Sequence, residues 1–398
     1  MPATPIDDRR PWSIFLVFLR LGLSAFGGPV AHLGYFRQEF VSRRGWLSEA
    51  AYTELIAIAQ FMPGAASSKV GMAIGLSQAG YRGALAAWLG FTLPSALLLI
   101  AFAHGLALEG SALASGALHG LKIVAAAIVA QAVWGMARAL CPDTRRRVLM
   151  LVAAAVALLV PGPGGQLAVI IGAGLLGIAV LKSKTQAVAD PLPIAISRRA
   201  GALWLGIFVL LLVGLPLLAH LLDSPLLSLF ELFYRTGALV FGGGHVMLPL
   251  LQAELVPNGW LSNDLFLAGY GATQAVPGPL FTFAAFLGTA IAGWLGGLLC
   301  LLAIFAPSFL LLVGVLPFWA RLRTRPRLQA AMAGVNAGVV GLLLATLYPT
   351  GRHGRRRQSA GFRPGAACPG GADGRQAAAV AGGIGWCADR LAGRLLKT

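Results

Sequence analysis

The sequence predicts an all-α polytopic membrane protein made of two inverted-topology repeats, each containing broken or re-entrant helical hairpins. Three observations lead to this prediction. Of the 398 residues, 57% are hydrophobic and 11% are charged, whereas an ordinary soluble domain has about 25% charged residues. A set of motifs recurs in the second half of the chain, and the distribution of Lys and Arg between the apolar runs is reversed there. The bilayer is therefore the expected solvent for much of the chain.

The charge balance and the missing catalytic motifs exclude several function classes. The formal net charge is +17, from 31 Lys and Arg against 14 Asp and Glu. Most of these basic residues lie between apolar runs, where they orient membrane spans, so nucleic acid is not an expected partner. The sequence has no Walker-type phosphate loop, no Ser/His/Asp signature and no metal-ligand spacing among its 4 cysteines. It predicts no enzyme, cofactor or metal, and it favours an ion gradient over ATP as the energy source.

The repeat consists of short motifs that recur in the same order about 215 residues later. The first pair is FLR followed by FGG within 18–28, which recurs as FYR followed by FGG within 233–243. The other pairs are GWLS at 45–48 and 259–262, Q-x-x-P-G at 60–64 and 274–278, and PS at 94–95 and 307–308. So many matches in one order indicate two halves with the same fold.

The basic residues indicate that the two halves are inverted. Three arginines lie within 37–44, after the first FGG motif, whereas the equivalent segment 251–263 has no Lys or Arg. Conversely, 105–118 has none and its counterpart 321–327 carries arginines. By the positive-inside rule, the halves then lie upside down relative to each other. Secondary transporters are often built this way, with the binding site between the repeats near the middle of the membrane.

The expected elements follow from the apolar runs, their glycine and proline breaks and the flanking charges. In the first half, hairpins over 12–36 and 49–80 break at 27–29 and 63–64, and spans at 84–104 and 119–140 and short crossings near 148–160 and 166–181 follow. In the second half, 201–222 crosses, hairpins near 228–252 and 262–292 enter from the other side, and 296–318 and 328–349 cross. The alternative is that each broken run spans the bilayer fully, which would give ten or more spans.

These elements divide the chain into five parts. They are a cytoplasmic N-terminal tail at 1–11, a first membrane repeat at 12–181, a cytoplasmic linker at 182–200, a second, inverted membrane repeat at 201–349 and a basic tail at 350–398. The tail is rich in Gly, Arg and Ala and is expected to be disordered. The repeat calls for two further crossings in its place, so the tail is interpreted as aberrant with respect to the repeat.

Helices that break inside a membrane leave backbone N–H groups unpaired, and their N-terminal ends attract anions. Four breaks that are paired across the repeat therefore predict an anion site. The glycines and prolines expected to form it are Gly27, Gly28, Pro63, Gly64, Gly242, Gly243, Pro277 and Gly278. The alternative is that they are packing glycines and kinks, which are common in membrane helices.

Charged side chains within the apolar arms are the next candidates. Arg20 and Arg235 occupy equivalent positions and are interpreted as buried cations without matching anions, because guanidinium forms forked hydrogen bonds to tetrahedral oxyanions. They would alternatively reach the headgroups or pair with Glu39 or Glu231. Lys69 is expected to hold the anion as a point charge, unless it extends to the membrane interface.

Uncharged donors and titratable groups complete the candidate site. Ser67, Ser68 and Gln274 are the expected hydroxyl and amide donors. His32, Glu54 and His245 are candidates for coupling proton movement to transport. A structural role is the alternative for each histidine.

The motifs resemble those of the chromate ion transporter family in its long, two-domain form. The resemblance covers about residues 12 to 349 and rests on FGGPVAHLGYFRQEFV with a following GWL, on QFMPGAASSKVG, on FGGGHVMLPLL and on QAVPGPLFTFAAFLG. It implies two homologous halves and export of chromate, with sulfate as the look-alike anion. It also assigns Arg20, Gly27, Gly28, His32, Pro63 and Gly64 to the first-half signature and Gly242, Gly243, His245, Pro277, Gly278 and Pro279 to the second.

The function expected from residues and resemblance together is secondary active transport of chromate, or of sulfate, across a bacterial inner membrane. Efflux by an antiporter, conferring chromate resistance, is the expected direction. An anion channel or a carrier of another oxyanion is the alternative. The expected partners are the anion and the lipid bilayer, and a homodimer stays open. The chain departs from the family where 63–65 reads PGA instead of PGP, and where the tail replaces the usual C-terminal crossings.

Overall fold

The computed structural model describes residues 10–108, 130–131, 133–160, 163–181, 194, 196–241 and 244–359. Every regular element within these ranges is a helix. Among them, 4 stretches are long and apolar enough to cross a membrane: Ala66–Leu106, Arg198–Leu222, Leu280–Leu322 and Pro326–Ala345. The prediction of an all-helical membrane protein is thereby confirmed.

The first half opens with helices that break at glycine and proline. In order they are α1 (Pro11–Ser24), α2 (Gly28–Phe36), the π-helix η1 (Arg37–Arg43), α3 (Glu49–Phe61) and α4 (Ala66–Leu108). Gly27 and Gly64 stand at the two breaks with φ of 98° and 105°, values that favour glycine. The first break lies at 25–27 rather than at 27–29, because Pro29 belongs to the first turn of α2, where its missing N–H is not needed.

The helix α4 is two helices joined by a sharp reversal. Ala79 has φ −139° and ψ 28°, and Gly80 has φ 60° and ψ −149°. A methyl group on Gly75 would overlap the backbone of Gly83, and one on Gly83 would overlap that of Gly75. In a straight helix these two residues would lie about 12 Å apart. The chain therefore turns back at 79–80, where the sequence predicted that a hairpin ends and a separate span begins.

The second half repeats these local structures. Its helices are α9 (Pro225–Leu239), the short 3-10 helix η2 (Gly244–Val246), α10 (Met247–Leu255), α11 (Asn263–Ala275), the 3-10 helix η3 (Leu280–Thr282) and α12 (Phe283–Val315). Gly278 stands at the break before η3 with φ 112°. Ala292 and Gly293 turn α12 back with φ of −136° and 68°. The caps match as well, because the Oγ atoms of Ser48 and Ser262 each accept a hydrogen bond from the backbone N–H three residues later.

The remaining helices complete the domain. They are α6 (Thr144–Leu159), α7 (Pro163–Val180), α8 (Arg198–Leu222), the 3-10 helix η4 (Leu316–Phe318), α13 (Trp319–Leu322) and α14 (Pro326–Ser359). The two short crossings expected near 148–160 and 166–181 correspond to α6 and α7. The last helix packs on both of them through small residues, since Gly334 lies against Gly177 and Gly341 lies against the backbone of Met150.

The last helix also corrects the expected boundary of the tail. We expected disorder from residue 350, but α14 continues through Ser359. The residues at 355–358 are three arginines and a glutamine, which are good helix formers and allow the helix to extend. Residues 360–398 lie outside the described part of the chain.

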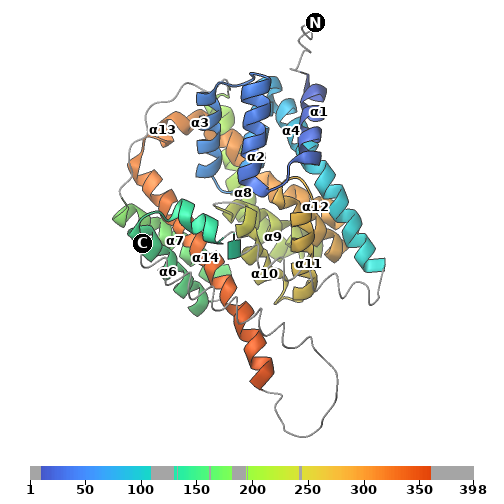
Figure 1. The fold of residues 1–398 in the computed structure, drawn as a ribbon, viewed down its shortest axis with the longest axis vertical. Helices are drawn as coiled ribbons and strands as arrows, with labels where there is room; N and C mark the ends of the chain where they lie inside the picture. The colour runs from blue at the N-terminus through green and yellow to red at the C-terminus, as the bar shows by residue number, and fades with distance from the viewer. Residues whose placement is uncertain are drawn as a thin grey trace.

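Figure 1 shows how the two sets of broken helices are arranged. The first-half helices α1, α2 and α3 lie in the upper part of the view, and α9, α10 and α11 lie below them, near its centre. The long helix α14 runs obliquely along one side, next to α6 and α7.

Aromatic packing fixes the arms of each hairpin. Phe18 of α1 packs on Phe36 of α2 and Phe40 of η1, with ring centroids 5.6 and 4.9 Å apart. In the second half, Phe266 of α11 packs on Phe283 of α12 at 5.2 Å. All five rings are fully buried. This burial holds the broken ends in place against their tendency to fray.

Candidate functional site

The breaks of the two halves meet and exchange hydrogen bonds. Gly64 N, between α3 and α4, donates to Val240 O at the end of α9, at 2.6 Å. Gly278 N, between α11 and η3, donates to Ala25 O at the end of α1, at 3.0 Å. The two donors occupy equivalent positions in the repeat, and so do the two acceptors. All four breaks therefore come together in one region between the halves, which we call the central breaks.

Glycine is required at the central breaks because a serine from the other half fills the space beside it. Ser308 Oγ accepts a hydrogen bond from Ala65 N at 2.9 Å, and a methyl group on Gly64 would overlap this hydroxyl. A methyl group on Gly278 would lie 2.7 Å from Ser95 Oγ. The sequence did not single out Ser95 or Ser308 for the site, although their recurrence as a Pro-Ser motif was the available signal.

His32 and Ser67 join α2 to α4 beside the central breaks. His32 is fully buried, and its Nδ1 lies 3.3 Å from Ser67 Oγ. Its ring stands edge-on to the ring of Phe91, with centroids 5.2 Å apart. The other ring nitrogen, Nε2, is buried and has no hydrogen-bond partner among the described residues. It is therefore available as a donor or an acceptor, depending on the tautomer.

Lys69 places a buried amino group at the same location. Its side chain is 0% exposed, and Nζ donates to Met62 O at 2.5 Å and to Pro63 O at 2.9 Å. These carbonyls follow the last turn of α3, where the helix dipole favours a cation. An ammonium has three N–H donors, so one is left for a ligand. Its burial excludes the alternative that Lys69 extends to the membrane interface.

Further buried polar atoms lack a hydrogen-bond partner within the described residues, among them Ser68 Oγ, Thr92 Oγ1 and Gln274 Nε2. An unpaired buried group of this kind costs about 1–3 kcal/mol, and each of these groups is chemically able to donate a hydrogen bond to an oxyanion. Thr92 was not expected from the sequence, because a single threonine in an apolar helix carries no pattern.

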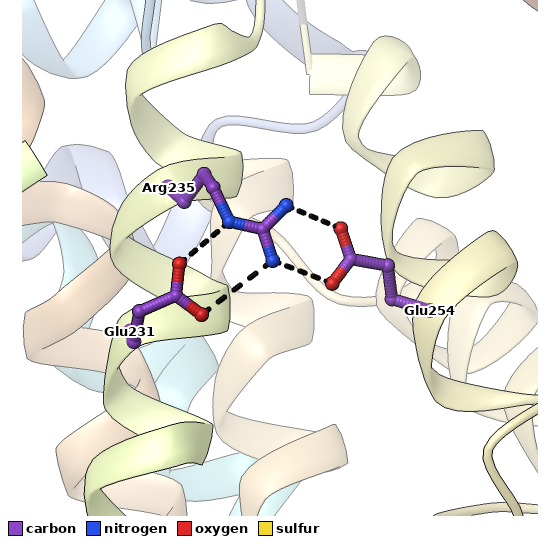
Figure 2. Close-up of polar contacts among 3 residues, drawn as sticks. All are labelled: Glu231, Arg235 and Glu254. Carbon is purple, nitrogen blue, oxygen red and sulfur yellow. Dashed lines mark hydrogen bonds and ion pairs between the residues drawn. The ribbon is translucent and has the colours of Figure 1, made fainter. Parts of the chain in front are cut away.

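Arg235 corrects the expectation of an unpaired cation in each half (Figure 2). Its Nε donates to Glu231 Oε1 at 2.6 Å, and its two terminal nitrogens donate to Glu254 at 2.5 and 2.6 Å. The pairing with Glu231 is the alternative that the sequence offered. Glu254 joins because α10 brings it alongside α9. With two carboxylates on one guanidinium, this group is negative and does not favour an anion.

The other expected cations and carboxylates lie elsewhere. Arg20 is exposed on α1 rather than buried. Glu54 on α3 accepts hydrogen bonds from Arg323 Nη1 and Trp319 Nε1, both at 2.5 Å, and so ties α3 to α13 and to the residue that caps it. This buried ion pair occupies the carboxylate that was a candidate for proton coupling.

Three candidates cannot be placed in the site. Gly242 and Gly243 lie outside the described residues. The backbone of His245 belongs to η2, and its side chain lies outside the described part. The glycines at 27 and 28 are placed, both with positive φ, at the break that leads into α2.

Both halves of the chain are similar to one protein family. The family model described as chromate transporter matches residues 12–178 and 227–387. The second match extends beyond residue 349, into the segment that the sequence had set apart as a tail. None of the solved structures matches the chain.

Individual relatives show the same similarity. A chromate transport protein of Pseudomonas aeruginosa is 30% identical over 340 residues, which cover 84% of this chain and 79% of the relative. A chromate transport protein of Cupriavidus metallidurans is 27% identical over 348 residues, covering 83% and 80%. The uncharacterized transporter YwrA of Bacillus subtilis is 34% identical over 128 residues, which are 72% of that protein and 32% of this chain. A relative of that extent is close in size to a single repeat.

Proposed function

This chain belongs to the chromate transporter family, and on that premise we propose that it is a secondary active transporter of chromate, with sulfate as the similar alternative cargo. The family consists of transporters, not enzymes. The proposed direction is efflux across a bacterial inner membrane, driven by exchange with another ion, which would give the cell resistance to chromate. The named relatives support the cargo, and the apolar helices support the membrane location.

The observation that carries the proposal is Lys69 at the central breaks. Chromate is a tetrahedral dianion, and a buried cation with a free N–H attracts it strongly in a medium of low dielectric. Lys69 also lies in the first turn of α4, whose dipole adds partial positive charge. Hydroxyl groups of Ser67 and Ser68 precede it on the same helix. In this proposal these residues bind the anion, and Gln274 donates to it from the other half.

The two halves are proposed to be inverted repeats that open alternately to the two sides of the membrane. The reversed charge distribution supports the inversion, as does the placement of the two sets of broken helices in different parts of the molecule (Figure 1). Two equivalent hydrogen bonds join the halves at the centre, from Gly64 to Val240 and from Gly278 to Ala25. Opening to one side would break one of them and keep the other, so the bound anion would always stay covered from one direction.

His32 is the proposed coupling group. The imidazole of His32 is able to hold a proton on either ring nitrogen, and its Nε2 has no hydrogen-bond partner among the described residues. Since His32 contacts Ser67, its protonation state sets the charge close to Lys69. A change of that charge would couple anion binding to the movement of another ion.

The test is transport by the purified full chain in liposomes. Vesicles preloaded with unlabelled chromate should take up labelled chromate against its concentration by counterflow, which a carrier shows and a channel does not. Sulfate and molybdate in the same assay define the cargo. Uptake that simply follows the electrochemical gradient, without counterflow, would identify a channel and would contradict the proposal.

A further inference from the structure

A second cluster of positive charge lies in a surface pocket of the first half, away from Lys69. The pocket has a volume of about 310 Å³ and lies between α1 and the continuous arm formed by α2 and η1. Its polar lining residues are Arg20, Ser24, Tyr35, Gln38, Glu39, Arg43 and Arg44. Three arginines thus face one carboxylate.

The repeat explains why one of these arginines is unpaired. Arg20 and Glu39 are the counterparts of Arg235 and Glu254, which form an ion pair in the second half. In the first half, Glu39 instead accepts from Arg43 Nη1 at 3.0 Å and from Arg44 Nε at 2.6 Å. The second half has no basic residue at the equivalents of these two positions. The guanidinium of Arg20 consequently has no hydrogen-bond or ion-pair partner among the described residues.

The ionised state of Glu39 maintains its ion pairs with Arg43 and Arg44. Burial acts to raise the pKa of Glu39, but the hydrogen bonds and charges of Arg44 and Arg43 outweigh burial and hold the pKa below its usual value. The carboxylate therefore stays ionised and stays with its two arginines. The side chain of Glu39 is 14% exposed, whereas that of Arg43 is 62% exposed and reaches the opening.

A pocket of the second half that contains Arg235, the counterpart of Arg20, lies against α8 and has the opposite character. It has a volume of about 530 Å³, and its charged lining residues are Asp223, Glu231 and Arg235. Two carboxylates there face one arginine that is already paired. Only the first-half pocket therefore offers positive charge and uncommitted guanidinium donors.

We infer that the pocket around Arg20 is a second binding site for a tetrahedral oxyanion, separate from the central breaks. The guanidinium of Arg20 would form a forked pair of hydrogen bonds to the ligand, and Arg43 at the opening would add charge. The same chemistry fits a free dianion such as sulfate or chromate and the phosphate of a lipid headgroup. For a free dianion the pocket deepens the proposed function, as a site that collects cargo at one end of the protein.

The experiment measures binding of labelled sulfate to the full chain carrying Lys69→Met, purified in phosphate-free detergent. This background removes the central cation, so binding reports the pocket and does not depend on transport. Adding Arg20→Gln should weaken binding about tenfold or more, as expected for loss of a charge-assisted forked contact. Adding Arg43→Gln and Arg44→Gln together should weaken it similarly, because Glu39 is then released to pair with Arg20. Adding Glu39→Gln should strengthen it.

A second arm separates the two sources of the ligand. The same variants are titrated with vesicles that contain phosphatidylglycerol and then with vesicles of phosphatidylcholine alone. Binding of phosphatidylglycerol that depends on Arg20, without sulfate binding, supports the site and identifies the ligand as a lipid headgroup. If neither ligand responds to Arg20→Gln and Glu39→Gln has no effect, the inference is wrong, whether or not the wild-type chain transports chromate.

Discussion

At the scale of single residues, the three cations that the sequence suggested as anion ligands have different surroundings. Lys69 is enclosed and is held by the carbonyls of Met62 and Pro63. Arg235 is bound by two carboxylates, and Arg20, its counterpart, has none. Position in the repeat therefore does not determine the role of a cation, because the neighbouring charges differ between the halves.

Arg235 should stabilise the fold rather than bind the cargo. Replacing it by Gln leaves Glu231 and Glu254 close together without a cation. Removing one partner of a buried ion group costs about 3–5 kcal/mol, and partial exposure places this group at or below the lower end of that range. We expect Arg235→Gln to lower the thermal midpoint of unfolding in detergent, measured by intrinsic fluorescence. Arg20→Gln, the matched control, should leave it unchanged.

The double variant Arg235→Gln with Glu254→Gln checks this interpretation. It removes one of the two repelling carboxylates, so it should recover part of the lost stability. A single variant as stable as the wild type would show that the ion group contributes nothing to folding.

These residues also show what the sequence could and could not indicate. Glu231 was recognisable as a partner because it lies one helical turn before Arg235. Glu254 was not, since its contact depends on how α9 and α10 pack. The capping of α3 by Lys69 was equally hidden, because it requires the path of the chain through the break at 62–65.

At the scale of elements, the broken helices depend on glycines that a serine of the other half approaches closely. Gly64 and Gly278 both have positive φ and both face such a serine. Each glycine N–H also donates to the other half. These contacts between the halves hold the broken helices of each half in position.

Alanine at Gly64 or at Gly278 should therefore destabilise the protein. Each change adds a methyl group where φ is unfavourable and where a serine hydroxyl already lies, and such changes cost about 1–3 kcal/mol. We expect both to lower the thermal midpoint and the amount of monodisperse protein in size-exclusion chromatography. Gly34→Ala is the control, since Gly34 lies within α2 with nothing near its side-chain position. If all three variants had the same thermal midpoint and the same yield of monodisperse protein, the close contacts at Gly64 and Gly278 would not stabilise the fold.

The hairpin arms were predictable from the sequence because glycine, proline and charge mark their ends. The reversals at 79–80 and 292–293 fell where a hairpin was expected to end. The hydrogen bonds between the halves were not predictable, because they join residues that are far apart in the chain. The continuation of α14 past residue 349 was missed, because composition suggested disorder where arginines favour helix.

At the scale of the whole molecule, inverted repeats predict that equivalent loops face opposite sides of the membrane. Segments 43–44 and 321–327 should face the cytoplasm and 252–263 the outside. We expect Ser42→Cys and Asn258→Cys, both exposed positions in a cysteine-free background, to react with an impermeant maleimide from opposite sides. Intact cells and inside-out vesicles distinguish the two sides. Labelling of both positions from one side would rule out the inversion.

The central claim is that the molecule carries a tetrahedral oxyanion on Lys69 between its two halves. The most direct measurement is chromate counterflow in liposomes by the wild-type chain, by Lys69→Met and by Arg82→Gln, an exposed cation just after the reversal of α4. We expect the wild type and Arg82→Gln to exchange chromate at similar rates. Lys69→Met should insert as a monodisperse protein but exchange at least about a hundredfold more slowly, because an anion in a site of low dielectric loses its fixed countercharge. Near-normal exchange by Lys69→Met would contradict the account.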